Sequence, residues 1–133
     1  MGLMGRFDWM YSKKYTADKQ TIKELNYEGY EKYLIGHTVS RPGSPRESVQ
    51  YLFKFDNGYG ASVVKGVGTY GYREDLWELS VLIFDEPDGD PYKEYCSYYN
   101  AYDTPITDDV LGYLSDADVR ETLDKIKELP DAK

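Results

Sequence analysis

The sequence predicts an α+β fold: an antiparallel β-sheet of about four strands with a C-terminal α-helix packed on one face. Two observations predict it. Apolar and polar residues alternate through three consecutive segments between Val49 and Phe84, and apolar residues recur at helical spacing near the C-terminus. The 133 residues can form one domain with its own hydrophobic core. We therefore treat residues 1–133 as a single domain.

The first two strands form a predicted hairpin. From Val49 to Phe55, aromatic and branched residues alternate with Gln50 and Lys54, the period of a half-buried strand. Asn57-Gly58 then supplies the positive φ angles of a tight turn. The segment 59–65 is therefore expected to return beside the first strand.

The third strand is predicted over Leu76–Phe84, after a glycine-rich loop at residues 66–71. It places four apolar side chains on one face: Trp77, Leu79, Val81 and Ile83. The strand should end at Asp85–Pro91, where two prolines flank an Asp-Gly turn.

Before the hairpin the pattern is weaker. Residues 1–15 are expected to form an irregular arm, and Thr16–Leu25 a short helix capped by Thr16. Aromatic and branched residues favour a strand over Tyr27–Val39. The prolines and glycine of Ser40–Arg46 predict a loop, which is also the most basic exposed stretch.

The C-terminal part is predicted to be helical over residues 107–129. Apolar residues up to Leu114 suggest one or two helical turns, and Ser115 has the spacing of an N-cap with Asp118 in the capping-box position. A helix is expected from Asp116 to about Leu129, with one apolar stripe: Val119, Leu123 and Ile126. Between residues 92 and 102 the tyrosines are spaced closer to a helix than to a strand.

Acidic residues are concentrated in the last third of the chain. Residues 1–84 hold eleven basic and ten acidic side chains, whereas residues 85–133 hold five and fourteen, which together give the net charge of −8. An acidic surface repels phosphate backbones, so we expect no direct binding of nucleic acid and a protein partner with a basic surface. Acidity that only keeps the protein in solution is the alternative.

Cysteine usage and hydropathy indicate a cytoplasmic protein. Cys96 is the only cysteine, which excludes an internal disulfide and a Cys-x-x-Cys site. No apolar run reaches the length of a membrane span, and the N-terminus lacks the apolar core of a signal peptide. We expect no association with a membrane.

Three short patterns resemble catalytic or binding motifs but lack the required context. Gly66–Gly71 matches the dinucleotide-binding letters, yet the segments around it form a meander and no βαβ unit is expected. Asp88-Gly-Asp90 lacks the spacing of a calcium loop. His37 and Cys96 are the only possible nucleophilic pair of their type, and nothing near them resembles an oxyanion hole. We therefore expect no cofactor, no metal and no catalytic residue.

Tyrosine is the residue type that suggests a binding surface. The chain contains fifteen, and a tyrosine ring can serve a half-exposed sheet or a protein interface. The predicted partner-binding residues are three tyrosines of the hairpin and glycine-rich loop and four acids of the C-terminal part: Tyr59, Tyr70, Tyr72, Asp88, Asp90, Asp108 and Asp109.

Three stretches resemble small proteins encoded by bacteriophages and prophages: Phe55–Val64, Leu76–Leu82 and Thr104–Leu114 with the helix that follows. They cover under half of the chain, and no catalytic residue comes with the resemblance. It implies that this protein acts in a bacterial host cell by binding and blocking a host defence or enzyme.

The expected function is therefore non-enzymatic: an acidic phage-type accessory protein that inhibits or modulates a host protein, such as a nucleic-acid-binding defence enzyme, in the manner of an anti-CRISPR or anti-restriction protein. Two alternatives stay open. One is a small metal-dependent hydrolase that uses clustered carboxylates, and the other is a structural or assembly component of a phage particle. The sequence does not indicate an oligomeric state.

Overall fold

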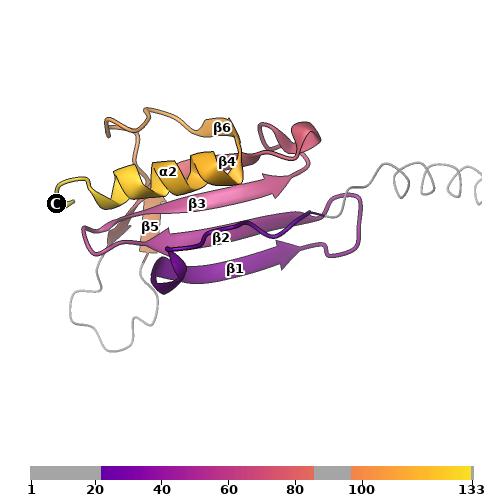
Figure 1. Ribbon diagram of the computed structural model, residues 1–133, viewed down its shortest axis with the longest axis horizontal. Coiled ribbons are helices and arrows are strands. Elements are labelled where there is room, and N and C mark those ends of the chain that lie inside the picture. The colour runs from indigo at the N-terminus through magenta and orange to yellow at the C-terminus, as the bar shows by residue number, and fades with distance from the viewer. Residues whose placement is uncertain (1–21, 86–96, 133) are drawn as a thin grey trace, which may run out of the picture.

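The computed structural model describes residues 22–85 and 97–132. Within them the chain forms six strands, one α-helix and two 3₁₀ turns, shown in Figure 1. The strands are β1 (Leu34–Ser40), β2 (Ser48–Lys54), β3 (Tyr59–Gly66), β4 (Trp77–Asp85), β5 (Ser97–Asn100) and β6 (Leu111–Leu114). The helical elements are η1 (Glu31–Tyr33), η2 (Tyr72–Glu74) and α2 (Asp116–Lys127). The predicted α+β fold is confirmed.

All strand pairs are antiparallel, in the order β1-β2-β3-β4-β5. β6 also pairs with β4. β5 lies opposite the second half of β4, from Leu82 to Asp85, and β6 lies opposite the first half, at Trp77 and Leu79. The sheet thus has more strands than the four expected, because two short strands share one edge of β4.

The core lies on one face of the sheet, beneath α2. Figure 1 shows the helix lying along β3 and β4, while the segment that precedes η1 runs along β2. Tyr27 of that segment packs its ring 5.6 Å from the ring of Tyr51 and 5.9 Å from that of Phe53. Trp77, one of the four residues predicted to share a face of the third strand, is buried there with 1% of its surface exposed.

The C-terminal helix forms as the sequence predicts. Ser115 accepts a hydrogen bond from the Asp118 backbone, and Asp118 accepts one from the Ser115 backbone, which completes the capping box. The predicted apolar stripe of Val119, Leu123 and Ile126 is fully buried. The helix ends two residues before the expected Leu129.

The hairpin turn between β2 and β3 caps the other end of α2. The Asn57 side-chain amide donates hydrogen bonds to the carbonyl oxygens of Ile126, at 2.9 Å, and Leu129, at 3.0 Å. The last carbonyl groups of a helix have no partner within it, so this amide supplies one. A turn residue therefore also fixes where the helix lies on the sheet.

Two expectations for the N-terminal part are wrong in the described region. Residues 22–25 of the predicted helix Thr16–Leu25 are not helical. Leu25 is buried in the core and its N–H donates to the hydroxyl of Tyr51 at 3.2 Å, so tertiary contacts hold this backbone in an irregular path. The strand predicted over Tyr27–Val39 begins only at Leu34, because the η1 turn precedes it.

Two expectations for the C-terminal part are also wrong. Tyr98 and Tyr99 lie in the strand β5, although the spacing of the tyrosines suggested a helix. The segment 107–129 is not helical throughout, since residues 111–114 form β6. In both places the open edge of β4 offers backbone hydrogen bonds to a chain with weak local preference, and strand pairing prevails. The arm at residues 1–15, and Asp88, Asp90 and Cys96, lie outside the described residues.

Candidate functional site

The structure separates the predicted binding tyrosines. Tyr59 is the first residue of β3 and is half-buried against the core. Tyr70 lies beyond the other end of β3, in the connection to β4, and is 58% exposed. An eight-residue strand is about 23 Å long, so these two side chains do not share a surface.

The structure also describes three of the other predicted residues, Tyr72, Asp108 and Asp109. Tyr72 opens the η2 turn and is half-buried. Asp108 and Asp109 are exposed and precede β6, the strand that contacts the β3–β4 connection.

A β-bulge in β6 presents a tyrosine that sequence reasoning missed. β6 pairs Leu111 with Leu79 and Leu114 with Trp77, so that two residues, Gly112 and Tyr113, face one on β4. Tyr113 has a φ of 58°, the left-handed conformation that costs a residue with a side chain about 1 kcal/mol. The residue is 58% exposed. The fold therefore holds a large aromatic side chain in solvent with a strained backbone.

Tyr113 and Tyr70 are joined through their backbones. The Tyr113 N–H donates to the Tyr70 carbonyl oxygen at 3.4 Å, and the Tyr70 N–H donates to a carboxylate oxygen of Glu78 at 3.2 Å. A Cβ on Gly112 would lie 2.5 Å from the Cβ of Tyr70, so only glycine fits between the two segments. We refer to these two exposed tyrosines as the Tyr70–Tyr113 surface.

The glycine-rich connection turns the chain back toward β4 and does not form a dinucleotide site. The Thr69 hydroxyl donates to the Gly66 carbonyl at 2.8 Å and accepts from the Gly66 N–H at 3.1 Å, which closes the loop. β3 and β4 pair antiparallel, and only the three-residue η2 turn follows the glycines. The predicted meander is confirmed.

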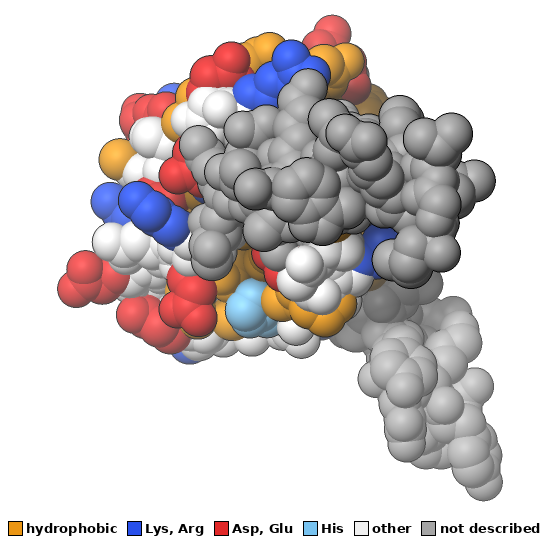
Figure 2. Space-filling view, turned by 90° about the vertical axis from the view of Figure 1, so that its right-hand side faces the viewer, with side chains coloured by type: hydrophobic (Ala, Val, Ile, Leu, Met, Phe, Trp, Pro, Cys, Tyr) orange, Lys and Arg blue, Asp and Glu red, His pale blue; other side chains and the backbone are white. Residues whose placement is uncertain are grey.

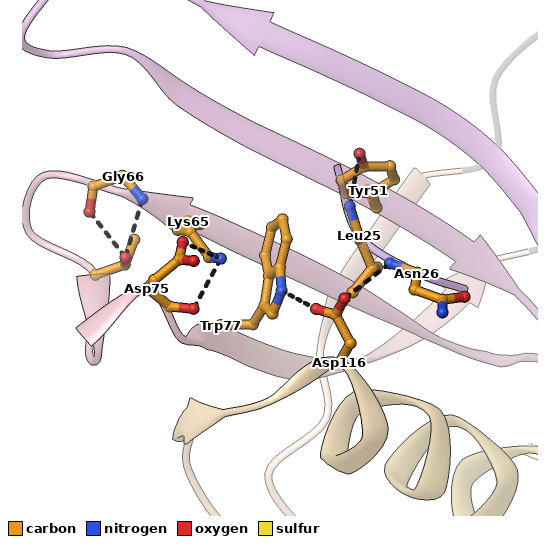
Figure 3. A network of polar contacts seen from close by, with 9 residues as sticks. Leu25, Asn26, Tyr51, Lys65, Gly66, Asp75, Trp77 and Asp116 are labelled. Carbon is orange, nitrogen blue, oxygen red and sulfur yellow. Dashed lines mark hydrogen bonds and ion pairs between the residues drawn. The ribbon is translucent and has the colours of Figure 1, made fainter. Parts of the chain in front are cut away.

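A buried lysine anchors this connection through Asp75 (Figure 3). Lys65 is 3% exposed, and its ammonium group donates to the Asp75 carboxylate at 2.8 Å and to the Asp75 carbonyl at 3.0 Å. The same nitrogen lies 4.1 Å from the centre of the Trp77 ring. A buried charge is tolerated only when it is paired, and here a carboxylate, a carbonyl and an aromatic face surround it.

Asp116 extends the same cluster to the helix and to the N-terminal segment. One carboxylate oxygen accepts the indole N–H of Trp77 at 2.7 Å, and the other accepts the Asn26 N–H at 3.2 Å. Arg120 donates to the Asn26 carbonyl at 2.8 Å. The first turn of α2 is thereby fixed to both β4 and the segment that precedes η1, as Figure 3 shows for Asp116.

Tyr51 lies between these elements with a buried phenol. Burial raises the pKa of Tyr51 above its ordinary value of 10.0, because the charged phenolate would lose its hydration. The Leu25 N–H donates to this oxygen and opposes part of that effect. The His37 ring stacks on the Tyr51 ring, and the two ring centres are 4.2 Å apart. The sequence's only histidine thus packs on a core aromatic ring.

Some of the missed residues left a signal in the sequence. Lys65 continues the alternation of Ala61 and Val63, so strand periodicity alone places it on the core face. Gly112 before Tyr113 is a glycine inside a short apolar run, which often marks a bulge. No sequence pattern indicates that Asp116 bonds Trp77, since these residues meet only in the folded chain.

Comparison with known proteins found no match among protein-family models, curated proteins or solved structures. In residues 22–85 and 97–132, no group of three or more histidine, cysteine or acidic side chains is placed to hold a metal ion. No helix of the same residues is long and apolar enough to cross a membrane.

The raised pKa of Tyr51 makes stability depend on pH in the alkaline range. The unfolded chain loses the phenol proton near pH 10.0 and the folded chain at higher pH, so the contribution is complete below that value and is lost as pH rises above it. We expect Tyr51→Phe, which has no proton to lose, to be less stable than the natural chain at pH 8 by an amount that shrinks toward pH 11. Urea unfolding at each pH measures the difference. Phe53→Leu, a core substitution without a titrating group, should show a constant difference, and a constant difference for Tyr51→Phe would contradict the account.

Proposed function

We propose that this protein is a non-enzymatic binding protein whose partner docks on the Tyr70–Tyr113 surface. The observation that supports this most is the backbone of Tyr113, which occupies a strained conformation and holds its ring in solvent. Strain of this kind persists where the surrounding structure imposes it, and it is concentrated at functional sites. A bulge that redirects one side chain is a typical feature of such sites.

The chemistry of the exposed apolar residues supports the same proposal. Five of the eight large hydrophobic side chains that are exposed in the described residues are tyrosines. Tyrosine contributes a large contact area, loses little conformational entropy on binding and keeps a hydroxyl for hydrogen bonding, so it is enriched at the centres of protein interfaces. The Tyr70–Tyr113 surface places two of these rings on neighbouring, mutually bonded segments.

Charge supplies a second part of the proposal. Asp108 and Asp109 are exposed just before the strand that carries Tyr113, and we infer that they attract a partner with a basic surface. Figure 2, which views the molecule from the right-hand side of Figure 1, shows acidic side chains interspersed with basic, apolar and uncharged ones. In this proposal the charges guide the approach and the tyrosines hold the complex.

The resemblance to phage accessory proteins suggests the kind of partner. On this proposal it is a host protein that the binding inhibits or modulates, and a defence enzyme with a basic nucleic-acid-binding surface would fit the acidic side chains. Recovery of partners from bacterial lysate on the immobilised protein, followed by mass spectrometry, identifies the partner for the experiments below.

Tyr113→Gly separates binding from stability. Glycine adopts the left-handed conformation freely, so we expect the free energy of unfolding to change by no more than about 1 kcal/mol while binding of the recovered partner weakens at least about tenfold. Surface plasmon resonance and urea unfolding measure the two quantities. The matched control is Tyr99→Ala, because Tyr99 is 51% exposed but pairs with Ile83, at the other end of β4. Equal binding by Tyr113→Gly and the natural chain would refute the proposal.

Charge reversal tests the role of the acids. The double substitution Asp108→Lys and Asp109→Lys should lower the association rate constant with little change in the dissociation rate constant, and higher salt should do the same to the natural chain. Stopped-flow measurements at about 50 and 300 mM salt compare the two proteins. The double substitution Glu121→Lys and Glu128→Lys, at two exposed positions, changes the net charge by the same amount and is the control for net charge alone. An association rate that responds to neither change would leave the acids a role in solubility only.

A further inference from the structure

β1 is the outermost strand of the sheet and is exposed along most of its length. It pairs with β2 on one side and ends the strand order on the other, among the residues that the structure describes (Figure 1). The stretch from His37 to Ser40 is exposed, and Val39 retains 42% of its accessible surface. An edge of this kind can accept another strand through its backbone.

The register identifies which backbone groups face outward. The Phe55 N–H donates to the Tyr59 carbonyl, so the backbone N–H and C=O groups of Phe55 point toward β3. Successive residues of a strand point these groups in opposite directions, so those of Gln50 and Leu52 point toward β1. Their partners on β1 are Thr38 and Gly36. The N–H and C=O groups of the intervening residues, His37 and Val39, therefore point to the open edge.

The exposed part of β1 lacks the features that usually prevent further pairing. Gly36–Ser40 contains no proline and no lysine. The only irregularity in its pairing with β2 lies between Leu34 and Gly36, at the beginning of the strand. The remaining five residues form a regular edge that contains no lysine, arginine or acidic side chain.

Basic residues mark one end of this edge. Arg41 follows β1 directly, Arg46 lies in the same loop, and both are exposed. Within residues 22–85 and 97–132, neither forms an ion pair with an acid. The nearby Glu47 carboxylate accepts the Gly43 N–H at 2.9 Å and is held in the loop. In an otherwise acidic chain, this end of β1 therefore favours a negatively charged ligand.

We propose that β1 binds an extended acidic segment of a partner protein as an additional antiparallel strand. The backbone of His37 and Val39 would hold the segment, and its acidic residues would lie opposite Arg41, at the N-terminal end of the bound strand. A second copy of this chain fits less well. Antiparallel pairing about Thr38 would place Arg41 opposite Ile35 of the other copy, and both copies carry a net charge of −8.

This site is separate from the Tyr70–Tyr113 surface. β2, β3 and β4 lie between the open edge of β1 and the bulge of β6. Neighbouring strands are about 4.8 Å apart, so the two surfaces are separated by roughly 15 to 20 Å across the sheet. One partner could span both sites or two partners could bind, and substitutions in one site leave the other intact.

A labelled peptide tests the proposal directly. The probe is Glu-Glu-Val-Thr-Val-Thr with a fluorophore at its C-terminus, and fluorescence anisotropy follows its titration with the full chain. We expect saturable binding with a Kd of about 1 mM or below, and binding at least about tenfold weaker for Lys-Lys-Val-Thr-Val-Thr, because the acids meet Arg41 and Arg46. Val-Thr-Val-Thr-Glu-Glu should also bind more weakly, since an antiparallel strand then places its acids at the wrong end.

Two variants of one residue separate the backbone from the side chain. Val39→Pro removes an outward N–H without removing a bond to β2, and it should reduce binding of the acidic probe at least about tenfold. Val39→Thr keeps the N–H and should bind as the natural chain does. Arg41→Glu with Arg46→Glu leaves the strand unchanged and should reverse the preference between the two probes, which keeps the proposal testable if Val39→Pro does not fold.

Tyr113→Gly should bind the probe as the natural chain does, which distinguishes failure of this site from failure of the proposed function. The proposal is wrong if the acidic probe does not saturate, if Val39→Pro binds it as Val39→Thr does, or if charge reversal leaves the preference between probes unchanged. Size-exclusion chromatography with light scattering completes the test. A dimer that Val39→Pro dissociates would assign the edge to a second copy and would also overturn the proposal.

Discussion

The indole of Trp77 is the contact on which the arrangement of the other elements depends. Its ring face contacts the ammonium group of Lys65, its ring forms a T-shaped pair with that of Tyr51, and its N–H donates to Asp116. β3, β2 and α2 are thus fixed relative to one residue at the beginning of β4. Because Asp116 also accepts the Asn26 N–H, the segment before η1 depends on the same contact.

The candidate binding surface is connected to this cluster. Lys65 bonds Asp75, which follows the η2 turn in the β3–β4 connection, and Asp75 itself has a φ of 60°. The connection carries Tyr70, and Tyr70 bonds the strained Tyr113. Asp75 and Tyr113, both left-handed and neither a glycine, therefore lie in neighbouring segments, and the buried Lys65 anchors the connection through Asp75. On the proposed function, the core supplies the rigidity that an exposed tyrosine pair needs for binding.

Local pattern was sufficient for elements that carry their own signal. The alternation in Val49–Phe55, the Asn57-Gly58 turn and the capping box at Ser115 each predict a structure from neighbouring residues alone, and each is confirmed. β5 and β6 were missed because their structure comes from pairing with β4, at residues whose own spacing suggested a helix. For the site, Tyr70 could be predicted as exposed from its place in a glycine-rich loop. Tyr113 could not, since its exposure follows from a bulge that exists only in the paired sheet.

The most direct test of this account is a double-mutant cycle between Trp77 and Asp116. Trp77→Phe keeps most of the buried ring but removes the N–H donor, and Asp116→Ala removes the acceptor. The hydrogen bond has a charged acceptor, so urea unfolding of the natural chain, the two single variants and the double variant should give a coupling free energy of about 1 to 2 kcal/mol. A coupling below about 0.3 kcal/mol would show that the helix and the sheet are joined by apolar packing alone and would contradict the account.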